Sequence, residues 1–359
     1  MNSPTLQLGN KTYSLGNLPK LSQTLTFDER TIDFCQRWLS GQQQFEIHSS
    51  GSTGQPKKIL ISRQSMIASA NGTIQALGLQ ANQTSLVCLD TAYIAGMMML
   101  VRSLEIGMNI IAVEPCANPF EKIKGQDQIH FAALVPYQVK AILDSPQNIF
   151  FSQFETVIIG GAPLDQFTKI QLQNFPCQFY ETFGMTETIS HIALKKINGK
   201  NKSDYFELLP NITIRQDERA CLCIKTPYLP DEIITNDVVE LKNLQEFMWL
   251  GRFDNVINSG GIKIFPESTE KKIELVFSLE NIKNRFFITG LPDERLGQAV
   301  TLIVEGSITP DQEGKTKQML REKLAKFEQP RSMLLVEKFD ETKNGKINRN
   351  ETRDRLIKS

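Results

Sequence analysis

The chain has 359 residues, and its 40 Lys and Arg residues balance 40 Asp and Glu residues, so the formal net charge is zero. A protein that binds the phosphate backbone of nucleic acids carries a basic excess, so this balance argues against nucleic-acid partners. Hydrophobic residues make up 40% and charged residues 22% of the chain, as in ordinary globular proteins, and the length suits two domains.

The sequence gives no sign of membrane insertion or of a disulfide framework. The start of the chain has no basic stretch followed by an apolar run, so no signal peptide is expected. The most apolar segment, residues 91–101, is shorter than the roughly 20 residues that a membrane span needs. The six cysteines lack paired C-x-x-C spacing and are interpreted as buried thiols. A cytoplasmic protein with no membrane partner is expected.

Short apolar runs alternate with helical patterns through the first two-thirds of the chain. Strands are predicted at residues 45–48, 59–62, 85–89 and 156–160, and a helix at residues 65–79. This alternation is typical of an α/β domain.

The pattern changes after Gly251. Residues 255–265 predict a β-hairpin that turns through Ser259, Gly260 and Gly261, and Pro266 suits the first turn of the following helix. Strands at 286–290, 299–305 and 331–339 and an amphipathic helix at 311–327 complete the order β-β-α-β-β-α-β. The sequence therefore predicts a small α+β domain, with the boundary at residues 252–254.

The most informative motif is SSGSTGQPK at residues 49–57. Consecutive backbone N–H groups and hydroxyls there can wrap a polyphosphate, and a lysine adds a point charge. The candidate phosphate-binding residues are Ser49, Ser50, Gly51, Ser52, Thr53, Gly54 and Lys57. The motif is not the ordinary P-loop, because G-x-x-x-x-G-K-[ST] is absent and a strand is expected next. The alternative is a Ser/Gly hairpin loop, which the length and order of the pattern disfavour.

The motif resembles the phosphate loop of the adenylate-forming enzymes, which include acyl-CoA synthetases, luciferases and peptide-synthetase adenylation domains. The resemblance covers nearly the whole chain from about residue 45, and typical members are longer at the N-terminus. It implies the adenylate-forming fold shortened at the N-terminus, with a large α/β AMP-binding domain at residues 1–253 and a small, mobile α+β domain at residues 254–359. It also implies ATP, CoA and Mg²⁺ as ligands.

Two further motifs match the nucleotide site of that family. In VIIGGAP (residues 157–163) the resemblance places Gly160, Gly161 and Ala162 against adenine, where small residues let a flat base approach the backbone. In YETFGMTET (residues 180–188) it assigns a base-stacking role to Phe183, phosphate contact to Thr186 and Mg²⁺ binding to Glu187, the only metal ligand expected. The same motif adds Tyr180, Glu181 and Thr182 to the nucleotide site.

The motifs IITND (residues 233–237) and WLGRFDNVINSGGIKIFPE (residues 249–267) extend the match. By resemblance, Asp237 accepts hydrogen bonds from both ribose hydroxyls, and Asn236 stands where the family usually has Gly. Arg252 is assigned a ribose or phosphate contact, and Asp254 is the hinge of the small domain. The hairpin residues Gly260, Gly261 and Lys263 are assigned to the CoA side of the site.

The last motif, TKNGKINR at residues 342–349, contains Lys346. A lysine close to the C-terminus is usually a solvated surface charge. In the family, this lysine bridges the attacking carboxylate and the α-phosphate during adenylation and offsets the charge that develops on oxygen. The Gly-Lys spacing selects Lys346 over Lys343.

Compact members of the family include the o-succinylbenzoate–CoA ligases of menaquinone (vitamin K2) biosynthesis, and residues 93–103, 184–195 and 344–349 resemble them. A substrate with an aromatic ring and two carboxylates needs apolar walls and a cation or donor. The candidate pocket residues are Tyr93, Met97, Arg102, Thr188, Ser190 and His191. Core packing is the alternative for each of them.

The resemblance therefore predicts an AMP-forming acid–CoA ligase whose acid is o-succinylbenzoate. One alternative is an aryl or fatty acid, or a carrier-protein thiol in place of CoA. A second is a nucleotide-binding homologue without catalysis. The oligomeric state stays open, a homodimer being one alternative.

Overall fold

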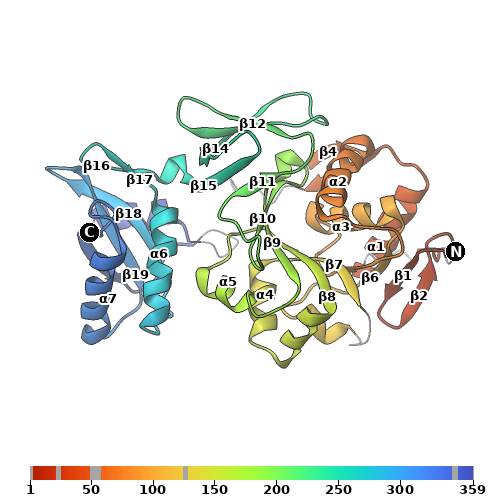
Figure 1. The fold of residues 1–359 in the computed structure, drawn as a ribbon, viewed down its shortest axis with the longest axis horizontal. Coiled ribbons are helices and arrows are strands. Elements are labelled where there is room, and N and C mark those ends of the chain that lie inside the picture. The colour runs from red at the N-terminus through yellow and green to blue at the C-terminus, as the bar shows by residue number, and fades with distance from the viewer. Residues whose placement is uncertain (1–2, 22–25, 49–57, 124–127, 342–346, 359) are drawn as a thin grey trace.

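The computed structural model describes residues 3–21, 26–48, 58–123, 128–341 and 347–358. The chain forms a 13-stranded sheet and, after residue 256, a separate five-stranded sheet. Figure 1 shows the C-terminal part beside the larger part, with α6 between the two sheets. The predicted combination of a large α/β domain and a small α+β domain is confirmed.

One half of the large sheet is parallel. In spatial order its strands are β1 (Thr5–Leu8), β6 (Asn109–Ala112), β5 (Thr84–Val87), β7 (Ile129–Leu134), β8 (Phe154–Ile159) and β9 (Gln178–Gly184), and the short β2 (Lys11–Ser14) pairs antiparallel at the edge. Along β7, Phe131 and Ala133 enter one hydrophobic core, whereas Ala132 and Leu134 enter another, because successive side chains point to opposite faces. Both faces are buried, which explains the continuous apolar runs in the sequence.

Helices cover both faces of these strands. α1 (Phe27–Leu39), α2 (Arg63–Leu77) and α3 (Ile94–Ile106) contribute to the first core, and α4 (Pro136–Leu143), α5 (Gln166–Leu172) and the 3-10 turns η1 (Pro119–Lys122) and η2 (Pro146–Gln153) lie with the second. The helix predicted at 65–79 begins two residues earlier, because the Ser62 hydroxyl caps it by accepting from the Ser65 N–H at 3.0 Å. It ends at Gly78, whose φ of +65° is the left-handed conformation of a helix C-cap.

The predicted strands on either side of the phosphate-loop motif are β3 (Gln44–His48) and β4 (Lys58–Ser62), which pair antiparallel in a small sheet of their own. The motif itself, residues 49–57, lies outside the described residues.

The large sheet continues with antiparallel strands after β9. They are β10 (His191–Lys196), β11 (Phe206–Leu208), β15 (Glu246–Arg252), β14 (Ile233–Leu241), β13 (Cys221–Lys225) and β12 (Thr213–Gln216), and the turn η3 (Thr186–Thr188) joins β9 to β10. The change from parallel to antiparallel pairing leaves the carboxyl ends of β8 and β9 facing η3 and β14. Such ends are where ligands bind in open α/β sheets.

The C-terminal part follows the predicted order. After the turn η4 (Phe253–Asn255) come β16 (Ile257–Ser259), β17 (Ile262–Ile264), α6 (Pro266–Leu279), β18 (Phe286–Asp293), β19 (Gly297–Glu305), α7 (Pro310–Lys323) and β20 (Ser332–Val336). A final helix, α8 (Arg349–Lys358), follows β20. The sequence did not indicate this helix, because its mostly charged residues show no apolar periodicity. Gly260 and Gly261 have φ values of +59° and +85°, which the tight β16–β17 turn requires.

α6 makes the contact between the two parts. The Gln166 N–H at the start of α5 donates to Glu274 Oε2 of α6 at 3.4 Å. The Asn255 amide donates to Glu267, and a Cβ at Gly251 would lie 2.3 Å from Glu267 Oε2. Gly251 therefore allows the first turn of α6 to approach β15 closely. The predicted domain boundary falls in η4, directly before this contact.

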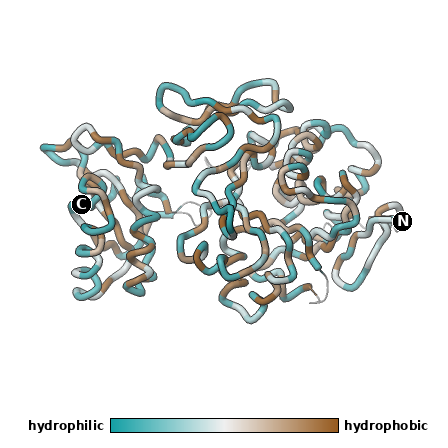
Figure 2. Tube along the Cα trace, viewed as in Figure 1, coloured by the Kyte–Doolittle hydropathy of each residue, from teal (hydrophilic) through white to brown (hydrophobic). Residues whose placement is uncertain are grey.

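Figure 2 shows hydrophobic residues along the central strands and hydrophilic residues along the peripheral loops. Among the described helices, none is both long enough and apolar enough to cross a membrane. The six cysteines are free thiols, and all but Cys116 are buried, in agreement with the sequence interpretation.

Candidate active site

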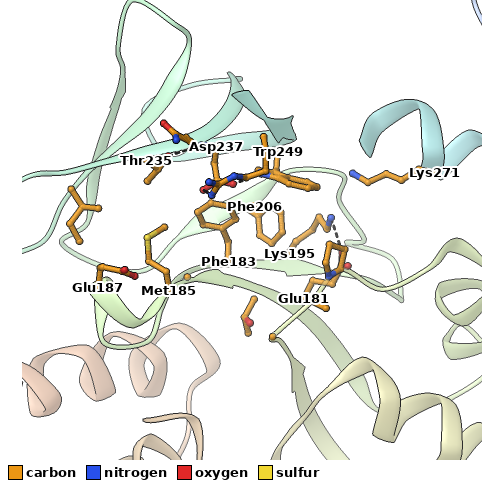
Figure 3. A pocket seen from close by; sticks show the side chains of 18 of the residues that line it. Glu181, Phe183, Met185, Glu187, Lys195, Phe206, Thr235, Asp237, Trp249 and Lys271 are labelled. Atoms are coloured by element: carbon orange, nitrogen blue, oxygen red, sulfur yellow. Dashed lines mark hydrogen bonds and ion pairs between the residues drawn. The ribbon is translucent and has the colours of Figure 1, made fainter. Parts of the chain in front are cut away.

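A cavity of about 620 Å³ opens where β8 and β9 end, between η3, β14, β15 and α6. Figure 3 shows its side chains, with Glu187 at one end, Phe183, Phe206, Asp237 and Trp249 in the middle, and Glu181, Lys195 and Lys271 at the other end. Four of the motifs found in the sequence meet here, although up to ninety residues separate them along the chain.

Small residues and an aromatic ring form part of the cavity wall. Gly161 lines the cavity with a φ of +86°, which needs glycine, and a Cβ at the preceding Gly160 would lie 2.3 Å from Thr182 Oγ1. Phe183 lines the cavity, and edge-on contacts hold its ring at centroid distances of 5.6 Å from Phe206 and 5.1 Å from Phe247. An aromatic face fixed in this way can stack on a planar base.

Asp237 lies in the cavity wall with its carboxylate oriented by neighbours. The indole N–H of Trp249 donates to Asp237 Oδ1 at 2.9 Å, and Arg252 Nη1 lies 3.7 Å from Asp237 Oδ2. Arg252 also pairs with Asp254 at 3.2 Å. Asn236, at the departure from the family pattern, donates to Asp254 at 3.3 Å. The Asp237 carboxylate can still accept hydrogen bonds from a vicinal diol, because each of its oxygens has a second lone pair.

Glu187 is an exposed carboxylate on η3 that lines the cavity. Within the described ranges no three His, Cys, Asp or Glu side chains cluster as a metal site. A single carboxylate beside a phosphate ligand suits Mg²⁺, which keeps water ligands and takes few from protein. The donor set therefore fits the expected ion. Thr186, on the same turn, is not among the cavity-lining residues.

The other end of the cavity contains a buried ion cluster. Glu181 is 4% exposed, and its Oε2 lies 2.7 Å from Lys195 Nζ and 2.9 Å from Lys169 Nζ, while Oε1 accepts from the Leu164 N–H at 3.0 Å. Burial acts to raise the pKa of Glu181, but the two ammonium groups hold it below its usual value. The carboxylate that the sequence assigned to the nucleotide is thus already bound by protein donors.

Tyr180 is not brought into the cavity. Its hydroxyl donates to Gln178 Oε1 at 3.0 Å, and its ring lies beneath the Lys196 ammonium at 5.7 Å. The reason is position along β9: Tyr180 lies before the carboxyl end of the strand, whereas Thr182 and Phe183 lie at that end.

A second cavity of about 220 Å³ adjoins the first and shares Gly161, Thr182, Gly184 and Met185 with it. Most of its wall is apolar, and the polar groups Arg102, Ser190 and His191 converge on it. Its remaining wall residues are Leu89, Ile94, Ala95, Ala133, Leu134, Val135, Ile158, Gly160 and Ile189.

Arg102 is a buried cation in this second cavity. It is 2% exposed, its Nη2 donates to Ser190 Oγ at 2.5 Å, and its Nε has no hydrogen-bond partner. Burial lowers the pKa of the guanidinium to about 9. Burial, with the positive charge of Arg102, holds the pKa of His191 well below its usual value, so this imidazole is neutral at pH 7. His191 is hydrogen-bonded to Thr73 at 3.0 Å and Ser190 at 3.3 Å.

The other three pocket candidates do not line this cavity. Met97 is packed in the hydrophobic core, and Tyr93 stands at the N-cap position of α3 without a side-chain capping bond and is 52% exposed. Thr188 is fully buried, and its hydroxyl bonds the Met185 and Ser190 carbonyls, so it shapes the η3 turn. Core or turn packing therefore accounts for Met97 and Thr188.

Two groups of assigned residues lie elsewhere. Gly260, Gly261 and Lys263 are exposed on the β16–β17 hairpin, and none lines either cavity in this arrangement of the domains. The phosphate-loop residues and Lys346 lie outside the described residues. Their assignments stay predictions.

The structure adds cavity residues that the sequence did not indicate. Trp249 begins a recognised motif, so its place beside Asp237 could have been found from the sequence. Lys169, Lys195 and Lys271 come from α5, β10 and α6, and no local pattern distinguishes them from surface lysines. Tyr228, in the loop between β13 and β14, lines neither cavity but lies near enough to Arg102 to affect the pKa of its guanidinium.

Comparison with known proteins identifies relatives that are AMP-binding enzymes. Residues 43–215 match the model of the AMP-binding enzyme family. The crystal structure of an acyl-CoA synthetase (AMP-forming)/AMP-acid ligase II-like protein from Dyadobacter fermentans is 36% identical, with a TM-score of 0.64, over 94% of this chain and 96% of that one. An o-succinylbenzoate CoA synthetase from Bacillus subtilis, solved with ATP and magnesium ion, is 18% identical with a TM-score of 0.66, over 86% of this chain and 69% of that one.

Curated relatives include the 2-succinylbenzoate–CoA ligases of Lactococcus lactis and Listeria innocua. They are 26% and 25% identical and align with 85% and 90% of this chain, which spans 69% and 72% of theirs. The chain belongs to the family of AMP-binding enzymes that includes the AMP-forming acyl-CoA synthetases.

Proposed function

We propose that the protein, an AMP-forming acid–CoA ligase, converts o-succinylbenzoate to o-succinylbenzoyl-CoA for menaquinone biosynthesis. The observation that carries the choice of acid is Arg102, a cation buried in a mostly apolar pocket whose other polar side chains are neutral. Among the described residues no carboxylate pairs with it, and its nearest polar partner is a neutral hydroxyl. A buried charge without a counter-ion is costly, so the pocket suits a substrate that brings one.

The two adjoining cavities suit the two parts of an acyl-adenylate. The larger cavity holds the groups expected to bind a nucleotide, and the smaller one offers apolar walls for an aromatic ring. Their shared residues, among them Gly161 and Gly184, mark where the reacting carboxylate would meet the α-phosphate. The ring carboxylate of o-succinylbenzoate would then pair with Arg102, while the succinyl carboxylate reacts.

In the first half-reaction the succinyl carboxylate attacks the α-phosphorus of ATP, which gives the acyl-adenylate and pyrophosphate. Phe183 would stack on the base and Asp237 would bind the ribose. Glu187, with the phosphates, would hold Mg²⁺, which offsets phosphate charge when bound. Lys346 would contact the carboxylate and α-phosphate, as the family resemblance implies.

In the second half-reaction the thiol of CoA attacks the acyl carbonyl carbon, and AMP leaves. Gly260, Gly261 and Lys263 lie away from the cavities here, so a rotation of the small domain about Asp254 would bring them to CoA. One site used twice requires such a step. We place the reaction in the cytoplasm, which the free thiols favour.

The test is pyrophosphate release from purified protein with Mg·ATP and CoA. The panel is o-succinylbenzoate, benzoate, succinate and a medium-chain fatty acid. Turnover confined to o-succinylbenzoate is the expected result. Turnover with another acid would keep the adenylation chemistry and refute the choice of acid, and nucleotide binding without pyrophosphate release would indicate a non-catalytic homologue.

A further inference from the structure

Lys271 projects from the small domain into the large cavity. It lies on α6, and its ammonium is 5.3 Å from the centroid of the Trp249 ring, on the indole that donates to Asp237 (Figure 3). Among the described residues that line this cavity, it is the only one that belongs to the small domain. The small domain thus adds a cation to the site.

Among the described residues that line this end of the cavity, the positive charges around Lys271 outnumber the negative ones. Lys169 and Lys195 share the single carboxylate of Glu181, which leaves a surplus of positive charge before Lys271 is counted. No ion pair of Lys271 is found among the described residues, and Glu274, one turn along α6, accepts from the Gln166 N–H. Three ammonium groups and one carboxylate therefore meet at this end of the cavity.

The surplus of positive charge affects the pKa of Lys271 itself. Burial, reinforced by the positive charges of Lys195 and Lys169 and only partly opposed by Glu181 and Glu274, lowers the pKa of Lys271 to about 8. The next residue, Lys272, shows the contrast: its ammonium binds both oxygens of Glu328, at 2.8 and 2.7 Å, inside the small domain. Among the described residues, Lys271 thus has the Trp249 ring beside it but no carboxylate paired with its ammonium group.

We propose that Lys271 is a nucleotide-binding residue that the small domain contributes to the cavity. The ligand is a nucleoside phosphate, whose negative charge and lone pairs balance the three lysines; this rests on the nucleotide in the proposed function. A contact made only when α6 is docked links nucleotide binding to domain docking, and the linkage is reciprocal. Bound AMP thus stabilises the arrangement in which α6 contacts the larger domain, and this arrangement in turn raises the affinity for AMP.

Calorimetric titration of AMP tests the proposal, with Lys271→Met and Lys271→Arg compared with wild type and Lys272→Met as the matched control. Loss of a charged hydrogen bond predicts about tenfold weaker binding for Lys271→Met, with most of the affinity kept by Lys271→Arg and all of it by Lys272→Met. Thermal unfolding confirms that each variant is folded. Wild-type binding with an unchanged Lys271→Met affinity would overturn this inference alone, whereas no AMP binding by wild type would overturn the proposed function with it.

Amine reactivity gives a readout that does not depend on affinity. A lysine with a pKa of about 8 is acylated faster near neutral pH than ordinary surface lysines, and mass spectrometry can follow Lys271 and Lys272 in the same sample. AMP is expected to protect Lys271 and not Lys272. Adenosine and pyrophosphate, used separately, show whether the nucleoside or the phosphate makes the contact. Equal labelling of Lys271 with and without all three would refute the proposal.

Discussion

Replacement of Arg102 by methionine tests the substrate pocket most directly. Methionine keeps an unbranched apolar chain but removes the charge and its donors. If the ring carboxylate of o-succinylbenzoate pairs with Arg102 away from water, losing one partner leaves a buried, uncompensated charge, which costs about 3–5 kcal/mol. At about 1.4 kcal/mol per factor of ten, kcat/KM should fall between about 100-fold and several thousand-fold.

The assay measures kcat/KM of wild type and of Arg102→Met with each of two acids, the first being o-succinylbenzoate. The second acid is 3-benzoylpropionate, which is o-succinylbenzoate without the ring carboxylate. Wild type should strongly prefer o-succinylbenzoate, whereas Arg102→Met should lose this preference and use 3-benzoylpropionate at least as well as wild type does. Arg102→Lys keeps the charge without the planar fork and should fall in between. Equal losses on both acids would refute the pairing and assign Arg102 to pocket structure.

The same variant should be more stable without substrate. Arg102 is 2% exposed and has an unpartnered Nε, so its removal relieves a desolvation cost of about 1–3 kcal/mol. Urea unfolding of the wild type and of Arg102→Met measures the difference. A less stable variant would mean that the guanidinium is a structural group, and it would weaken the case for a substrate counter-ion.

Three further outcomes are expected. Lys346→Ala should abolish formation of the acyl-adenylate but largely spare thioester formation from pre-made acyl-adenylate, and equal loss of both half-reactions would refute the assignment. Glu181→Gln should lower the free energy of unfolding by about 3–5 kcal/mol at pH 7, because two lysines lose a buried carboxylate; since the pKa of Glu181 is lowered in the folded protein, this difference should shrink as the pH falls below 4.5, and urea titrations at several pH values measure it. Burial, with Asp165 nearby, raises the pKa of Glu274 to about 7. The stability that protonated Glu274 gives to the α5–α6 contact should therefore be lost as the pH rises from 4.5 through 7. Proteolysis of residues 253–256 at several pH values measures this loss, and Glu274→Gln should remove the pH dependence.

The order of elements was predictable because it depends on local patterns. The strands of the small domain follow their apolar runs, and α6 begins at Pro266 as expected. α8 was missed because its residues are mostly charged and its anchor is distant: Arg349, at its start, binds Glu270 of α6 with two hydrogen bonds of 2.7 Å. A helix held by ion pairs to residues outside it, from Arg349 to Glu270 and from Arg355 to Asp340, leaves no periodic signal in the sequence.

Many residues of the larger cavity were predictable from the sequence for a different reason. Glycines at 160 and 161, the aromatic ring at 183 and the carboxylate at 237 occur in short strings whose chemistry is specific. The structure places Gly161, Phe183 and Asp237 in the larger cavity, whereas Gly160 lines the adjoining smaller one. Tyr180, in one of these strings, points elsewhere, because a motif does not state which of its residues reach the end of the strand.

The sequence by itself determined the family, the α/β and α+β division and several of the residues that line the larger cavity, since each depends on neighbours within about ten positions. Only the tertiary structure decided which charged groups lack a counter-ion among the described residues. Arg102 and Lys271 look like ordinary cations in the sequence, and Glu181 looks like a free carboxylate. Folding buries Arg102 beside neutral groups and gives Glu181 two lysines, leaving Lys271 with none of that charge. Burial and charge balance are sums over distant segments, and no local pattern contains them.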